Sequence, residues 1–257
     1  MINFLNKKRD KAIKITQPND LNKIKKNKYI IFSTKSMFMM SNDVMIIDNS
    51  SKMPVWWKNI KRGNGSLSSC HGVVDYLKNG FTMPMWADIE FSYINDSWAA
   101  FYDLDTPYGN FGIDEFSYDQ VGECPATDVR EIKNSSFIKL QTPWAIKTPK
   151  GWSCLILPAL WEPRSDYSIM PGVVNTDYYH HINVIINPTT KENFEINFKD
   201  NLIHIIPFKR QKNLKHIWGD DSVYSVLWHK SYGKVFKSIN TRGLYRKCQK
   251  EIDEQKK

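Results

Sequence analysis

The sequence has no long apolar run, and its first residues do not predict a signal peptide. None of its apolar runs approaches the ~20 residues that a membrane-spanning helix needs. The first fourteen residues, MINFLNKKRDKAIK, carry charges where a signal peptide has an apolar stretch. We therefore expect a cytoplasmic protein with no membrane partner. With only 12 glycines and 12 prolines in 257 residues, collagen-like and mucin-like chains are excluded.

Cysteines are few and widely spaced, and the common enzyme motifs are missing. The four cysteines lie at positions 70, 124, 154 and 248, and no CxxC occurs. This spacing argues against a disulfide framework and against a zinc knuckle. Walker, GxGxxG, HExxH and GxSxG motifs are absent. The sequence therefore supports none of the commoner enzyme classes, and its catalytic residues are unknown.

The net charge of +9 is concentrated at the two ends. Residues 1–28 have a net charge of +7 and residues 209–257 of +8, which leaves −6 for residues 29–208. Such ends could contact nucleic acid or another polyanion, or could be solvated tails. Only seven of the 36 basic residues are arginine. Because arginine is preferred for bidentate phosphate and base recognition, nucleic acid is the weaker expectation.

We expect three parts: a basic, partly mobile N-terminal segment 1–28, a single mainly-β domain 29–210, and a basic helical C-terminal segment 211–257. The run at 29–33 (YIIFS) predicts a first strand. A short helix is predicted near 69–79, with Ser68 or Ser69 as its cap and Asn79–Gly80 as its end. A turn at Asn95–Asp96 predicts a hairpin. Residues 109–130 form a long predicted loop.

From Phe137 to Arg210 the sequence predicts short antiparallel strands, because proline and glycine recur at regular breaks. After Arg210 the pattern changes to two predicted helices, at 220–239 and 243–255. Val223, Val226, Leu227 and Tyr232 suggest an apolar stripe on the first of them.

Two clusters of side chains are candidate sites. Asp177, His181 and His204 could assemble a two-histidine, one-carboxylate metal site across strands, although ordinary hydrogen-bonded histidines explain the same residues. The carboxylates at positions 103, 105, 114 and 115 suggest a cation or acid–base site or a solvated loop. Cys154 lies in an apolar strand, which favours a buried thiol over a nucleophile.

The segment Gly172–Tyr178 (GVVNTDY), followed by INVII, resembles the GVIDxDY–strand signature of the dUTPase-like β-clip enzymes. The flanking runs PKGWSCLILP and NLIHIIPF are similar to neighbouring strands of those enzymes, and they occur in the same order. The resemblance implies a β-clip-like fold and a nucleotide ligand. Mg²⁺ is the cofactor that would accompany such a ligand, and the assembly would be a homo-trimer. Asp177 and Tyr178 match the second acidic residue and the aromatic residue that stacks on deoxyribose.

Asn175 departs from that signature, since it stands where the resemblance implies the Asp that orients the attacking water. An amide cannot take up a proton as a carboxylate does. The Arg-Ser-Ser phosphate motif and the glycine-rich C-terminal motif are also missing. The resemblance therefore implies a degenerate binder rather than an efficient hydrolase.

A second resemblance spans most of the chain. The ordered runs SSCHGVVDYLKNGFTMPMWADI, PWAIKTPKGWSCLILP, PGVVNTDYYHHINVIIN and IIPFKR look like an uncharacterised family encoded by tailed marine bacteriophages and some bacteria. This resemblance implies a phage-type accessory protein in the cytoplasm of a bacterial host, without assigning it an activity.

Together these observations predict a mainly β (α+β) fold with an antiparallel β-clip-like core, a short helix near 69–79 and C-terminal helices. Its predicted function is to bind a nucleotide or small polar ligand through Asn175, Asp177, Tyr178 and Trp152, with Trp144 as another stacking candidate. One alternative is a structural protein that assembles with a virion or host component. The other is an oxygenase or hydrolase that uses the metal site described above.

Overall fold

The computed structural model describes residues 29–34, 45–61, 63, 66–102, 113–115, 137–159, 162, 164–211 and 215–232. The predictions for 1–28 and 243–255, and for most of 109–130, lie outside these residues. So do the carboxylates at 103 and 105. No helix among the described residues is both long and apolar enough to cross a membrane.

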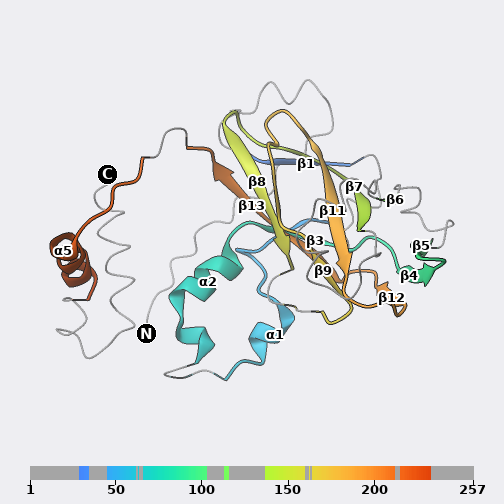
Figure 1. The fold of residues 1–257 in the computed structure, drawn as a ribbon, viewed down its shortest axis with the longest axis horizontal. Helices are drawn as coiled ribbons and strands as arrows, with labels where there is room; N and C mark the ends of the chain where they lie inside the picture. Colours follow the sequence, from blue (N-terminus) through green and yellow to red (C-terminus); the bar gives the residue numbers. More distant parts are fainter. Residues whose placement is uncertain are drawn as a thin grey trace.

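Three antiparallel sheets form the body of the protein (Figure 1). In the first, strands run in the order β1 (Ile31–Ser33), β7 (Ile138–Lys147), β11 (His181–Pro188) and β9 (Tyr167–Ile169), and β6 (Ile113–Glu115) also pairs with β7. The second has the order β10 (Gly172–Val174), β8 (Trp152–Pro158), β13 (Asn201–Lys209), β3 (Phe81–Pro84) and β2 (Ile47–Asp48). The third contains β12 (Phe194–Ile196), β4 (Ile89–Ile94) and β5 (Ser97–Tyr102). The predicted mainly β, antiparallel fold is confirmed.

Alternating side chains explain how these strands share one core. Along β11, Ile182, Val184 and Ile186 are buried at every second position, as expected for one face of a strand. They join a single apolar cluster that draws residues from all three sheets. Two of its members, Phe91 of β4 and Phe194 of β12, stack with ring centroids 4.9 Å apart.

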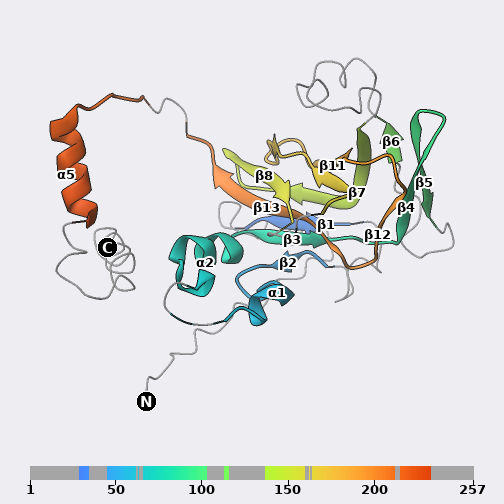
Figure 2. The same ribbon diagram turned by 60° about the horizontal axis from the view of Figure 1, so that its bottom comes forward.

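The hairpin predicted at Asn95–Asp96 is present. Its strands β4 and β5 pair antiparallel, and the two turn residues have φ values of 51° and 62°. Positive φ at both central positions is typical of the two-residue turn that matches strand twist, and Asn and Asp tolerate it well. The hairpin projects at the end of the molecule opposite the C-terminal helix (Figure 2).

The predicted helix near 69–79 is also present, with a different start. A single 3-10 turn (Leu67–Ser69) precedes α2 (His71–Lys78), and a four-residue helix α1 (Val55–Lys58) lies close by. Neither predicted serine caps α2. Ser66 caps the 3-10 turn, and Cys70 precedes α2 without a side-chain hydrogen bond. The chain leaves α2 at Gly80, whose φ is +71° and where a Cβ would collide with the carbonyl of Ile205.

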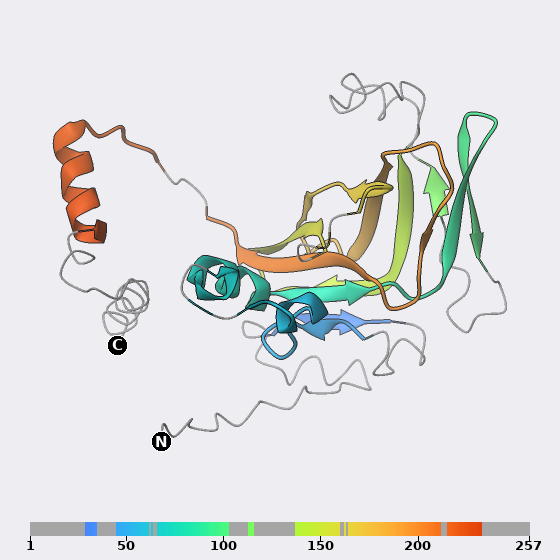
Figure 3. The ribbon, with the colours of Figure 1, turned by 90° about the horizontal axis from the view of Figure 1, so that it is seen from below.

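After β13 the chain leaves the body. Helix α5 (Asp221–Tyr232) stands apart from the sheets in all three views (Figure 3). It starts where the sequence predicts and is described as far as Tyr232, whereas the prediction extends to 239. The division of the chain at residues 28 and 210 stays a prediction.

Candidate functional site

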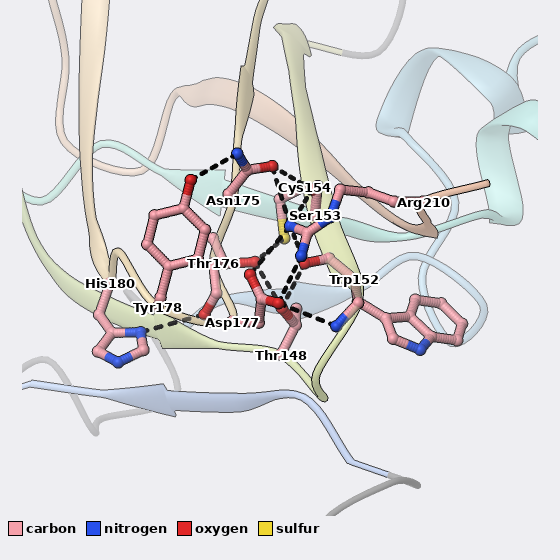
Figure 4. Close-up of polar contacts among 11 residues, drawn as sticks. Thr148, Trp152, Ser153, Cys154, Asn175, Thr176, Asp177, Tyr178, His180 and Arg210 are labelled. Atoms are coloured by element: carbon pink, nitrogen blue, oxygen red, sulfur yellow. Dashed lines mark hydrogen bonds and ion pairs between the residues drawn. The ribbon is translucent and has the colours of Figure 1, made fainter. Parts of the chain in front are cut away.

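The turn that follows β10 carries three of the four predicted ligand-binding residues. Val174, the last residue of β10, pairs with Cys154 of β8, so the turn begins at the edge of the second sheet. The backbone amides of Tyr178 and Tyr179 both donate to the carbonyl of Asn175, at 3.2 and 3.0 Å. Residues 175–179 therefore form one compact turn, called here the Asn175 turn (Figure 4).

The Asn175 amide is oriented by its neighbours. Its Oδ1 accepts from Ser153 Oγ at 2.6 Å and from Arg210 Nη1 at 2.9 Å. Its Nδ2 therefore faces the other way and donates to the phenol oxygen of Tyr178 at 2.9 Å. Tyr178 nevertheless remains 70% exposed. The turn thus presents an aromatic ring that is tethered at its tip and open to solvent.

Asp177 is held by an ion pair rather than left open to a ligand. Arg210 donates to both carboxylate oxygens, Nη1 to Oδ1 at 2.9 Å and Nη2 to Oδ2 at 2.5 Å. The Gly151 amide donates to Oδ2 at 2.9 Å. These hydrogen bonds, first those from Arg210, lower the pKa of Asp177 to about 2. Asp177 is therefore ionised at neutral pH and is a weak base.

Arg210, which the sequence analysis did not single out, is the hub of the site. It follows β13 directly, and its backbone amide donates to Gly151 O at 2.8 Å. Its Nη1 also lies 3.1 Å from Trp152 O and 2.9 Å from Ser153 Oγ. The hydrogen bond to Asp177 raises the pKa of Arg210. One feature of the sequence could have identified Arg210. It is an arginine at the end of a predicted strand, in a chain whose basic residues are mostly lysine, and arginine binds carboxylates bidentately.

Thr176 anchors the Asn175 turn between two sheets. Its hydroxyl lies 2.7 Å from Thr148 Oγ1, just beyond β7, and 3.3 Å from Cys154 Sγ in β8. Its carbonyl contacts His180 Nδ1 at 3.1 Å. Burial raises the pKa of the Cys154 thiol, which favours the protonated form over a nucleophilic thiolate. This region is therefore a rigid support.

The predicted tryptophans lie elsewhere. Trp152 contributes its backbone carbonyl to the site, but its indole extends away from Tyr178 (Figure 4). Trp144 is buried in the core, with its Nε1 unpartnered. The structure thus groups Asn175, Asp177 and Tyr178 and leaves both indoles apart from the Tyr178 ring.

The candidate metal ligands lie in unlike surroundings. His204 is fully buried in β13, with Nε2 2.6 Å from Asn79 O, and burial lowers its pKa. His181 is exposed at the start of β11, in another sheet, while Asp177 pairs with Arg210. Within the part of the chain that the structure describes, no group of three or more His, Cys, Asp or Glu could hold a metal ion.

Comparison with known proteins yields only distant matches. No family model and no curated protein matches the chain. The solved structures that match include the native dUTPase of EIAV, with 10% identity, 75% of this chain and 98% of that chain covered, and a TM-score of 0.35. They also include the dUTPase from phage phi11 of S. aureus, with 9% identity, 70% and 99% covered, and a TM-score of 0.30.

Proposed function

We propose that this protein binds a nucleotide or a related small polar ligand at the Asn175 turn and does not hydrolyse it efficiently. The observation that carries the proposal is the exposed Tyr178 ring, tethered through its hydroxyl to Asn175. Stacking a base on an exposed aromatic ring is worth about 1–3 kcal/mol. A ring that is already held in place loses little conformational freedom on binding, which favours affinity.

The polar groups around the ring suit binding better than proton transfer. Asn175 has an amide in place of a carboxylate, and Asp177 has its negative charge committed to Arg210. Neither side chain supplies a base whose pKa lies near neutrality. One amide hydrogen of Asn175 remains after the bond to Tyr178, and it can donate to a ligand carbonyl.

A thermal-shift screen with deoxynucleotides, with and without Mg²⁺, tests the proposal. A ligand at ~100 times its Kd should stabilise the protein by about 2.7 kcal/mol, or roughly 5–10 °C in Tm. Tyr178→Ala should reduce this shift by a third or more, as expected for the loss of about 1–3 kcal/mol of stacking. Tyr179→Ala is the matched control, because Tyr179 is the adjacent tyrosine and is 52% exposed. Equal shifts in both variants, or no shift in the unmodified chain, would refute the assignment.

The wider setting belongs to the same proposal. The bacteriophage-type runs noted in the sequence support an accessory protein that works in the cytoplasm of a bacterial host. A homo-trimer is the assembly that the β-clip resemblance implies. Sedimentation of the purified protein and recovery of the chain from infected cell fractions would test these two points.

A further inference from the structure

The C-terminal helix α5 exposes an apolar surface that the proposed ligand site does not use. The described residues from 215 to 228 are all exposed. The large apolar side chains among them are Ile217, Trp218, Val223, Tyr224, Val226, Leu227 and Trp228. So much exposed apolar area on one short segment is typical of an interaction surface.

The stability of α5 raises the same question. Twelve residues of the helix are described, and isolated single helices gain little stability in water from helix propensity alone. Asp220 caps its start, since Oδ1 accepts from the amides of Ser222 and Val223 at 3.0 and 3.2 Å. A cap contributes only about 1 kcal/mol. Most of the stability of such a helix has to come from packing against another surface.

The apolar residues of α5 gather on one face. Val223 and Leu227 are four residues apart, as are Tyr224 and Trp228, so these four side chains form a stripe. The rings of Tyr224 and Trp228 stack, with centroids 5.8 Å apart and planes 26° apart. Val226 was predicted to belong to the stripe with Val223 and Leu227, but it lies about 130° around the helix from the centre of this stripe.

The stripe is complementary to itself in the antiparallel direction. When two α5 helices are centred between residues 225 and 226, Val223 lies level with Trp228 of the other copy. Tyr224 then lies level with Leu227 of the other copy. A large side chain thus meets a smaller one at each level, which favours interlocking packing.

Charge also favours this arrangement. Asp220 and Asp221 stand at the start of the helix, and Lys230 follows Asp221 by nine positions in the sequence. In an antiparallel pair the helix dipoles oppose one another, and Asp221 of each helix lies level with Lys230 of the other. We propose that α5 pairs antiparallel with α5 of a second copy of this chain, forming a symmetric dimer contact.

Sedimentation velocity of the full chain over a wide range of concentration tests the proposal. We expect pairing of chains through α5 that dissociates on dilution, in addition to any trimer that the β body forms. Leu227→Asp should raise the dimer Kd about a hundredfold or more, because each dimer carries the substitution twice on the stripe. Val226→Asp is the matched control. Val226 is 54% exposed and Leu227 is 60% exposed on the same helix, but Val226 lies off the stripe. It should change Kd by about twofold at most.

Further readouts separate this contact from a folding defect and from other partners. The Tm of the β body should be unchanged in both variants. A chain that stays monomeric at every concentration would overturn the proposal. So would pairing of chains with the same Kd in Leu227→Asp, or equal weakening by both variants. A trimer that persists unchanged in both variants belongs to the β body and not to α5. Binding of the monomer to single-stranded DNA or to anionic vesicles, lost in Leu227→Asp, would assign the stripe to that partner instead. None of these outcomes depends on Tyr178 or on nucleotide binding.

Discussion

Two polar networks on the second sheet differ in charge and in access to water. The first joins Asp177 and Arg210 at the end of β13, where an ion pair holds the Asn175 turn. The second is neutral and buried. In it, His204 Nε2 contacts the carbonyl of Asn79, Thr82 Oγ1 donates to Asn49 at 2.7 Å, and the Tyr76 ring lies 5.0 Å from the His204 ring.

The two networks have different roles: the buried one fixes the packing of the fold, and the charged one holds a turn at the surface. The buried network fixes where α2 and the following turn meet the sheet, because Asn49 Nδ2 also donates to Asn79 O, at 3.2 Å. The charged network leaves an aromatic ring in water. A neutral network can be sealed from solvent at modest cost, whereas an ion pair is more stable where water still reaches it. Access for a ligand is thus found at the charged network.

The largest expected effect comes from the glycine beside the buried network. Gly80→Ala places a Cβ against the carbonyl of Ile205 at φ +71°. The strain of a left-handed backbone conformation and the collision together should lower the free energy of unfolding by about 2–5 kcal/mol. Gly151, beside the charged network, has φ +82° but open space around a Cβ. Gly151→Ala should therefore cost only about 1–2 kcal/mol in urea unfolding. Equal losses would contradict the collision at Gly80.

Acid should weaken the buried network first. Burial lowers the pKa of His204 below its unfolded value of about 6.5, so the unfolded chain takes up the proton first. Stability should fall as pH decreases from ~6.5 towards the lower folded pKa. His204→Gln should flatten this part of the Tm–pH profile, even if its Tm is lower at neutral pH. A profile that keeps its slope in the variant would assign the effect to another group.

The charged network should respond only in stronger acid. The pKa of Asp177 is lowered to about 2, so its stabilisation is complete above ~4 and is lost as pH falls from about 4 to about 2. Arg210→Met should remove that response and lower Tm by several degrees. Arg164→Met is the control in a more exposed pair with Asp166, and it should lower Tm less. The reverse ranking would show that Arg210 is not the hub of the site.

The smallest effect on stability is expected at the ring itself. Tyr178→Phe removes the hydrogen bond from Asn175 but keeps the aromatic face. The free energy of unfolding should change by less than about 0.5 kcal/mol. Nucleotide affinity should fall only a few-fold, against about 5–150-fold for Tyr178→Ala, the range that corresponds to a lost stacking interaction. Titration calorimetry of both variants would separate the contribution of the hydrogen bond between Tyr178 and Asn175 from that of base stacking on the Tyr178 ring.

The strands and the hairpin were predictable because their signals are local. Ile182, Val184 and Ile186 show the two-residue period of a strand, and Asn95–Asp96 is a turn sequence that needs no tertiary contact. The predicted start of α2 was wrong because several neighbouring serines could each cap a helix. Which of them acts as a cap depends on the 3-10 turn that precedes α2. The three-sheet arrangement depends on long-range pairing that one sequence does not encode locally.

The site was predictable only in part, for a related reason. A motif resemblance identified Asn175, Asp177 and Tyr178, which are neighbours in the chain. Arg210 lies 33 residues from Asp177, so their bond depends on how β13 and β10 flank β8. Trp152 was chosen for its ring, but at the site it contributes its backbone carbonyl. Side-chain direction follows from the sheet and not from residue type.

Arg210 also marks a mechanical boundary in the chain. Its amide donates to Gly151 O and its side chain binds Asp177. The chain is thus attached to the body at two points just before the segment from residue 211 through α5, called here the C-terminal arm. Tension on α5 would therefore load the contacts of Arg210 with Gly151 and Asp177 before it separates β13 from β8. The amide proton of Arg210 should exchange slowly with solvent. Force applied to the C-terminal arm should speed up the exchange of this proton before any strand opens.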